Sequence, residues 1–272
     1  NGIDIQEFMI TPVERTSFRD GFEKIVNTYH TLKKVIEDAG YTTGLGDEGG
    51  FAPDLKNSEE ALQMLHDAII KAGYTPGKEI AIAFDAAASY FYNRTTHNYD
   101  FEGKTYTPAA LGDYYLQLLA KFPEIVSIED PYGEEDWDNF ASFTAAHGDQ
   151  LQIVADDPVC TNPQLIRQAI QRGMANNILI KLNQIGTVTE TLAAIRLARK
   201  NGYATMMSHR SGETGDTFVA DFTVATNAAQ LKAGAPARSE RVEKYNQLLR
   251  IEEELGTDGA RLAHFPNNVM FD

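Results

Sequence analysis

Short apolar runs recur along the chain and mark its expected β-strands. The first run spans residues 5–10 and is stopped by Pro12; others cover residues 80–84, 125–128, 151–155, 178–180 and 204–207, and a last short one leads into Lys232. A continuous apolar run between turn residues is typical of a strand covered on both faces, as in a parallel sheet.

Between these runs, apolar residues recur at helical spacing. Helices are predicted over residues 17–39, 58–72, 108–122, 137–146, 187–200, 217–228 and 239–255, and another begins at Asn162-Pro163. Ser58 is expected to cap the second helix, and Thr107 the third, with Pro108 at its first position. Strand and helix alternate six times, which predicts right-handed crossovers and a parallel sheet. Six such units and a leading strand favour a closed α/β barrel, a fold of about 250 residues.

Composition narrows the class of protein. The 272-residue chain is 43% hydrophobic and 10% aromatic, enough for one large core. Its formal charge of −15 argues against nucleic acid and anionic membrane surfaces as partners. The single cysteine, Cys160, excludes an intrachain disulfide and suits a reducing cytoplasm, and no run has the length of a membrane span. The chain starts at Asn1-Gly2 without methionine, so we expect that an upstream part was removed or belongs to another chain.

The residues that directly follow the six later strands form the candidate site. The carboxyl ends of the strands of a parallel barrel meet at one face, where barrel enzymes have their active sites. This position holds three successive carboxylates and then cationic or titratable groups: Asp85, Glu129, Asp156, Lys181, His209 and Lys232.

Three converging carboxylates predict a cation between them. Oxygen ligands select a hard divalent ion, and Mg²⁺ suits a site with few protein ligands. Each of Asp85, Glu129 and Asp156 alone could instead cap a helix or form a loop salt bridge. We assign that structural role to Asp130 and Asp157, which follow two of the expected ligands.

The two lysines are expected to lie across from this cation. Lys181 follows the apolar run Ile178-Leu179-Ile180, where burial would lower its pKa, and repulsion from Lys232 would add to that effect. A neutral Lys181 could take a proton from carbon next to a metal-bound carboxylate. The alternative is a lysine whose ammonium reaches solvent from a strand end.

Two loops supply further candidates. Residues 43–53 contain four glycines and Glu48, a candidate general acid whose alternative is a solvated loop carboxylate. His209 is followed by Arg210 and Ser211, which offer a guanidinium and a hydroxyl suited to phosphate. Residues 211–214 could also be ordinary helix-start chemistry.

At these residues the sequence resembles the enolase family, the phosphopyruvate hydratases. The matching stretches are residues 6–10, 46–53, 84–85, 127–131, 154–157, 181–186, 208–214, 234–241 and 246–256. The resemblance implies that residues 1–272 are the carboxyl-terminal catalytic domain, a TIM-like enolase barrel of ββαα(βα)6 type that lacks its first strand in this chain. It also implies a hydro-lyase of glycolysis and gluconeogenesis that dehydrates 2-phosphoglycerate, a small phosphorylated substrate, to phosphoenolpyruvate. Enolase-superfamily enzymes are known to combine a lysine or histidine base with Mg²⁺.

The resemblance also implies a role for each candidate residue. Asp85, Glu129 and Asp156 would hold the first Mg²⁺, and Lys181 would take the C2 proton. Glu48, with Glu7 nearby, would assist departure of the C3 hydroxyl. Substrate contacts would come from Lys232 at the carboxylate, Arg210 and Ser211 at the phosphate, and His209 and Gln6.

The chain departs from the family pattern in four places. The amino-terminal lid domain and the first barrel strand are missing, Tyr90 stands where the family usually has glutamate, Pro158-Val159-Cys160 differs, and no match is expected from Ala260 onward. Three readings stay open beside an active enolase: a noncatalytic binding or structural relative, a truncated form that needs a separate amino-terminal part, and another superfamily enzyme acting on a different carboxylate. We expect a homo-oligomer or association with the missing part.

Overall fold

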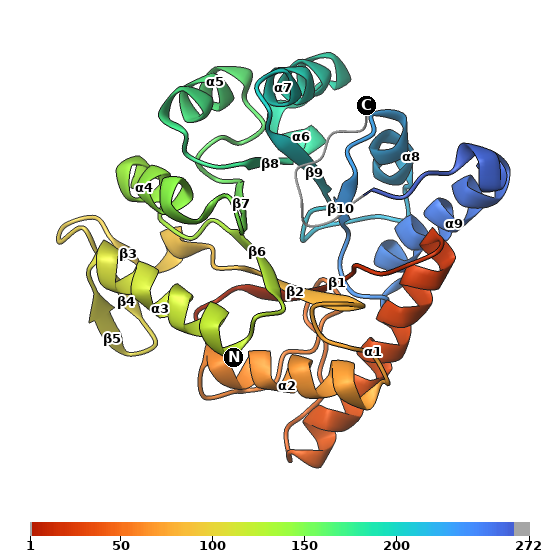
Figure 1. The fold of residues 1–272 in the computed structure, drawn as a ribbon, viewed down its shortest axis with the longest axis horizontal. Helices are drawn as coiled ribbons and strands as arrows, with labels where there is room; N and C mark the ends of the chain where they lie inside the picture. The colour runs from red at the N-terminus through yellow and green to blue at the C-terminus, as the bar shows by residue number, and fades with distance from the viewer. Residues whose placement is uncertain (1, 264–272) are drawn as a thin grey trace.

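A seven-stranded sheet forms the centre of the structure, a computed structural model that describes residues 2–263. In spatial order the strands are β1 (Glu7–Pro12), β2 (Ile80–Asp85), β6 (Ile125–Glu129), β7 (Gln152–Ala155), β8 (Asn177–Ile180), β9 (Ala204–Ser208) and β10 (Gln230–Lys232). All neighbouring pairs are parallel except β1 and β2. Figure 1 shows the strands around the middle of the molecule with helices outside them. The strand predictions are confirmed within one or two residues.

The helices also lie where the apolar spacing predicts them, apart from the short α6, which was not predicted. They are α1 (Phe18–Asp38), α2 (Ser58–Lys71), α3 (Pro108–Lys121), α4 (Trp137–His147), α5 (Pro163–Arg172), α6 (Leu182–Ile185), α7 (Val188–Lys200), α8 (Phe218–Ala225) and α9 (Ser239–Gly259). The backbone of α9 leaves helical geometry at Gly256, so its regular part ends at the predicted Leu255. Within residues 2–263, no helix combines the length and apolar character that crossing a bilayer requires.

The parallel sheet predicted from the six strand–helix units is present, whereas the direction of β1 was not predicted: β1 runs antiparallel to β2, with Glu7 opposite Asp85 and Pro12 opposite Ile80. Two packed helices, α1 and α2, lie between β1 and β2, whereas each later connection returns the chain to the start of a parallel strand. The two helices pack against each other on the outer side of β1 and β2 (Figure 1). They therefore place the amino end of β1, and the glycine loop between the helices, at the face where the other strands end.

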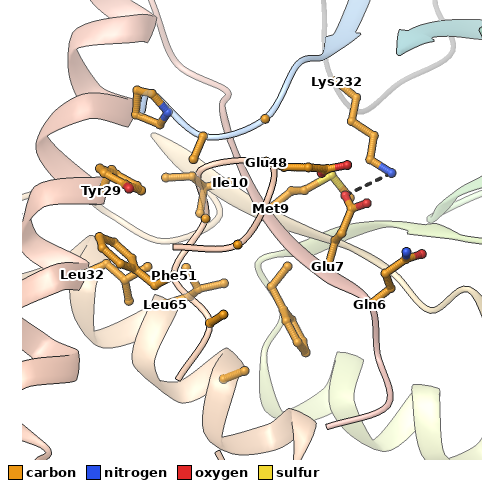
Figure 2. A pocket seen from close by; sticks show the side chains of 18 of the residues that line it. Gln6, Glu7, Met9, Ile10, Tyr29, Leu32, Glu48, Phe51, Leu65 and Lys232 are labelled. Atoms are coloured by element: carbon orange, nitrogen blue, oxygen red, sulfur yellow. Dashed lines mark ion pairs between the residues drawn. The ribbon is translucent and has the colours of Figure 1, made fainter. Parts of the chain in front are cut away.

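The sheet has the seven strands that the resemblance implies, and its edges are β1 and β10. These strands are not hydrogen bonded to each other in the described part of the chain, so the sheet is curled rather than closed, unlike the ring favoured by the apolar pattern alone. A pocket of about 450 Å³ lies between the two edges, with walls from Met9, Ile10, Tyr29, Phe51 and Leu231 (Figure 2).

A small antiparallel sheet between β2 and α3 was not predicted. It follows a short helix, η1 (Ala88–Phe91), and consists of β3 (Tyr92–Asn93), β4 (Asn98–Phe101) and β5 (Lys104–Tyr106). Polar and aromatic residues alternate along β4, and the turn that follows it, Glu102-Gly103, has both residues at positive φ. Together these features indicate a β-hairpin. Tyr99 and Phe101 are fully buried, so this sheet is part of the main core.

The cap prediction for α2 is wrong by one residue. Asn57 is the N-cap and its side chain accepts from the backbone N–H of Glu60, whereas Ser58 is the buried first residue of the helix. Thr107 caps α3 as predicted.

We expect Asn57→Ala to lower the free energy of unfolding by about 1 kcal/mol, because the Glu60 N–H loses its acceptor. Ser58→Ala is the matched control, since the Ser58 hydroxyl makes no hydrogen bond in the described chain. Urea unfolding at neutral pH measures both variants. An equal loss from both would contradict the cap assignment.

Candidate active site at the strand ends

Lys232 is the centre of the candidate site. Its Nζ lies 3.0 Å from Asp85 Oδ2, 3.0 Å from Glu129 Oε2 and 3.1 Å from Glu7 Oε2. The strands explain this meeting: Asp85 and Glu129 are neighbours in the β2–β6 register, and Glu7 lies opposite Asp85. The Glu7–Lys232 pair spans the two sheet edges (Figure 2).

The pKa values of the residues in this cluster depend on their burial and on the ammonium group of Lys232. Burial alone would lower the pKa of Lys232, but Asp85, Glu129 and Glu7 raise it well above its usual value. Burial and the neighbouring Asp85 raise the pKa of Glu129 well above its usual value. The pKa of Glu7 rises to about 7, mainly through burial, which Lys232 only partly offsets.

A second ion pair joins Lys181 and Asp156. Lys181 Nζ donates to Asp156 Oδ2, and Gln184 Nε2 donates to Asp156 Oδ1 at 2.9 Å. Thr161 Oγ1 accepts from the Lys181 backbone N–H at 2.9 Å and donates to Gln184 Oε1. Thr161 and Gln184 were given no role from the sequence, because only the fold brings them together.

The predicted fall in the pKa of Lys181 does not occur. Burial lowers it, but Asp156 raises it by more, so the net shift is upward. The prediction counted repulsion between two lysines and omitted the carboxylates, which outnumber them here. Lys181 is therefore an ammonium in this arrangement. Its side chain is only 16% exposed, so the solvent-facing alternative is also wrong.

Asp130 has the structural role expected of it. It is buried, and its carboxylate accepts from the backbone N–H groups of Asp156 at 2.9 Å and Asp157 at 3.0 Å. In the described chain, Asp130, Asp156 and Asp157 are the acidic side chains that have ligand oxygens within 4.8 Å of one another. The expected ligand set of Asp85, Glu129 and Asp156 is not such a group within residues 2–263: Asp85 and Glu129 pair with Lys232, and Asp156 pairs with Lys181.

The donor chemistry of the expected set nevertheless fits Mg²⁺. Carboxylate oxygens of Asp85 and Glu129 already surround one positive charge, the ammonium group of Lys232. All three residues are at most 5% exposed and offer only oxygen. Asp156 pairs with Lys181 through Oδ2 and accepts from Gln184 through Oδ1 in this structure.

Glu48 lies on the glycine loop between α1 and α2 and faces β9 and its following loop. Its Oε2 is 3.3 Å from His209 Nε2, and its Oε1 accepts from the Ser211 hydroxyl at 3.2 Å. Burial would raise the pKa of Glu48, but the hydrogen bond from His209 and nearby positive charge lower it to about 2. Glu48 is therefore ionised here, and the general-acid role predicted for it needs a prior gain of a proton.

The remaining predicted contacts lie around the mouth. Arg210 donates from Nη1 to Asn183 Oδ1 at 2.8 Å, and Ser211 is exposed. Gln6 is exposed and precedes β1, where its backbone N–H donates to Asp85 O at 3.0 Å. His209 is 3% exposed, so only a substrate that had already entered the pocket could contact it. Tyr90 is 80% exposed in η1, beyond β2 and outside these contacts.

The structure is a curled α/β sheet with acids, lysines and a glycine loop at its strand ends. A family model described as "Enolase, C-terminal TIM barrel domain" matches residues 1–265, and the chain belongs to this family. The match includes residues 260–265, although no match was expected from Ala260 onward. Residues 264–272 lie outside the part of the chain that the structure describes.

Individual relatives agree with the family. The chain is 99% identical over all 272 residues to a protein named "Enolase 2" of Lactiplantibacillus plantarum, and covers 63% of that protein. It is 70% identical over 272 residues to "Enolase 2" of Lactobacillus johnsonii, covering 64% of it, and 67% identical over 272 residues to the "Enolase" of Lactobacillus helveticus, covering 63%. The chain thus spans somewhat less than two thirds of these relatives' length.

We expect the stability of the protein to carry a pH signature of Glu7. Its pKa is about 7 in the fold and 4.5 as the ordinary value, so the folded state binds more protons between these pH values. The contribution is therefore fully present below pH 4.5 and falls as pH rises towards 7, by up to roughly 3 kcal/mol. Glu7→Gln should flatten this part of the curve of unfolding free energy against pH. Parallel curves for the two proteins would contradict the assignment.

Mg²⁺ should stabilise the chain through Asp85 and Glu129. At a free concentration 100 times the Kd, the expected gain is about 2.7 kcal/mol. Asp85→Asn should lose this Mg²⁺-dependent increment, whereas Asp138→Asn, at a side chain that is 98% exposed, should keep it. Thermal unfolding with and without Mg²⁺ measures the increments. Equal increments in both variants would exclude Asp85 as a ligand.

Proposed function

We propose that the chain is the catalytic barrel domain of an enolase that dehydrates 2-phosphoglycerate to phosphoenolpyruvate with Mg²⁺. The observation that carries the proposal is the meeting of Glu7, Asp85, Glu129 and Lys232 beside the Lys181–Asp156 pair. Family membership supports the reaction class. Bound Mg²⁺ would supply positive charge to the substrate carboxylate and so make the C2 proton more acidic.

Lys181 is the proposed base at C2. It keeps its proton while Asp156 is its partner, because that carboxylate outweighs the effect of burial. If Asp156 turned to the other carboxylates, the largest effect that raises the pKa of Lys181 would weaken. Burial and the charge of Lys232 would then lower this pKa towards that of a usable base, opposed mainly by Glu129. The Thr161 contact would hold the backbone of Lys181 in place during that exchange.

Lys232 is the proposed partner of the substrate carboxylate. Its three carboxylate neighbours keep it protonated and hold its Nζ at the strand ends. Arg210 and Ser211 are the proposed phosphate contacts, because both are accessible at the mouth and carry donors suited to phosphate oxygens.

Glu48 is proposed to act at the C3 hydroxyl, together with Glu7. An anionic substrate beside Glu48 would raise its pKa and favour the protonated form that a general acid requires. Glu7 already has a pKa near 7, so it can hold or release a proton at neutral pH. His209 and Gln6 are proposed as further contacts at this side of the pocket.

The wider setting is also proposed from the family and the composition. A cytoplasmic location suits the single cysteine and the net charge of −15. Association with a further copy or with a separate amino-terminal part would suit the unpaired edges of β1 and β10. Neither nucleic acid nor a membrane is proposed as a partner.

The test is Mg²⁺-dependent formation of phosphoenolpyruvate, followed by its absorbance, with the chain alone and with a separately produced amino-terminal part of the 99% identical relative. Lys181→Ala should lower kcat by about 10²- to 10⁴-fold, the usual contribution of a general base. Lys200→Ala, at an exposed lysine that ends α7, is the matched control and should keep full activity.

Other outcomes separate the competing functions. No turnover even with the added part would point to a noncatalytic relative. Preference for an unphosphorylated acid in a substrate screen would point to a different superfamily reaction and would exclude the phosphate role of Arg210 and Ser211. Equal activity of Lys181→Ala and the control would exclude Lys181 as the base.

A further inference from the structure

Arg241, in the first turns of α9, is a buried cation with an unusual set of partners. It is 1% exposed, and within residues 2–263 no carboxylate forms a salt bridge with it. It donates from Nη2 to the carbonyl oxygens of Asp47 at 3.2 Å and Ser211 at 2.6 Å, and from Nη1 to that of Arg210 at 2.5 Å. One guanidinium therefore joins the glycine loop to the loop that follows β9.

The fourth partner of Arg241 is the ring of His209. Arg241 Nη1 lies 2.6 Å from His209 Nδ1. A guanidinium has only donors, so this contact requires an unprotonated Nδ1 that accepts. The ring proton must then be on Nε2, and Nε2 faces Glu48 Oε2 at 3.3 Å. The contacts form a chain of defined polarity from Arg241 through His209 to Glu48.

We propose that Arg241 is a positioning residue of the site, which fixes the Nε2–H tautomer of His209 and through it the place of Glu48 against Ser211. Only the effect of Arg241 on catalysis rests on the proposed function. The tautomer and the loop contacts are properties of the folded chain. Glu48 and Ser211 are the groups that meet substrate, and Arg241 acts on them through His209 and through the backbone.

The charges around His209 agree with this assignment. Three elements bring charged groups to the ring: Glu48 from the glycine loop, Arg241 from α9 and Lys232 from β10. Burial lowers the pKa of His209, Arg241 and Lys232 add to that effect, and the hydrogen bond to Glu48 opposes it without reversing it. The ring is therefore neutral at neutral pH, as a donor to Glu48 and an acceptor from Arg241 must be.

Close packing at Gly234 shows how little freedom this arrangement has. Gly234 has φ +82°, and a Cβ there would lie 2.7 Å from Glu48 O, 2.9 Å from Arg241 Cδ and 3.1 Å from His209 Cε1. The side chains of Arg241 and His209 and the backbone of Glu48 thus meet at one point, where only glycine fits. Small displacements of the guanidinium would be transmitted to both other groups.

Lys244 offers a matched control on the same helix. It is fully buried, pairs with Glu213 Oε2 at 2.9 Å and donates to Thr214 O, so it holds the other end of the loop after β9. None of its hydrogen bonds or ion pairs in the described chain involves His209. Arg241 and Lys244 are therefore both buried, positively charged residues of α9, but only Arg241 contacts the ring of His209.

The test is ¹H–¹⁵N NMR of the histidine rings in the 272-residue chain, with the His209 signals assigned through His209→Gln. The wild-type ring should be protonated on Nε2 and not on Nδ1, with a pKa below the ordinary 6.5. Arg241→Gln should raise the pKa of His209 by about one unit and mix the two tautomers, because a buried positive charge and the donor to Nδ1 are both lost. Lys244→Gln should leave the His209 signals as in the wild type.

Three results would overturn the proposal: Nδ1 protonated in the wild type, no change in Arg241→Gln, or equal changes in Arg241→Gln and Lys244→Gln, the last meaning a merely structural role. If circular dichroism shows that Arg241→Gln does not fold, Arg241→Lys replaces it; lysine keeps the charge without the fork, so tautomer mixing with a smaller pKa change is then expected. The readout needs no turnover. A chain that is inactive on 2-phosphoglycerate even with the added amino-terminal part, but shows this tautomer, would refute the proposed function and leave the role of Arg241 intact.

Discussion

One ammonium held by three carboxylates organises this structure. Lys232, at the end of β10, is 8% exposed and meets Glu7, Asp85 and Glu129. Burying these charges is favourable only if they compensate one another, because each alone would pay a large desolvation penalty. The contact also connects the two edges of the curled sheet, β1 and β10, which have no backbone hydrogen bonds to each other in the described chain. The same pairing therefore concentrates charge for chemistry and fixes where the open edges lie.

The antiparallel first strand is what makes this cluster possible. A parallel β1 would have carried Glu7 to the opposite face, away from the ends of β2 and β6. The α1–α2 pair reverses the direction of the strand and returns a loop to the site, so that Glu48 reaches His209 and Ser211. Gly49 in this loop has φ +81°, and a Cβ there would lie 2.6 Å from Ala237 O, so the loop packs directly on the backbone before α9.

Two groups of residues determine the protonation states in the site, and they are called here the strand-end layer and the loop layer. The strand-end layer consists of acids and lysines whose pKa values depend on each other, as in Lys181, which keeps its proton because of Asp156. The loop layer consists of His209, Glu48 and the buried Arg241, whose donors and acceptors leave one consistent arrangement of protons. A change in the first layer, such as the arrival of a cation, alters charge directly. The second layer keeps its geometry because it is connected to three backbone carbonyls.

The sequence alone determined the positions of the strands and main helices, because apolar period and turn residues act locally. It also determined which residues would stand at the strand ends, since Asp85, Glu129, Asp156, Lys181 and Lys232 directly follow apolar runs. It missed β3–β5, whose strands are too short to show a clear period, and it placed the α2 cap on Ser58 because Asn57 and Ser58 are both good caps. Only the tertiary structure decided the direction of β1, the partners of Lys181 and the role of Arg241. These depend on which charges become neighbours although they are far apart in the sequence, from 25 residues for Lys181 and Asp156 to 225 for Lys232 and Glu7. The sign of a pKa shift follows from those neighbours and their burial rather than from the order of residues.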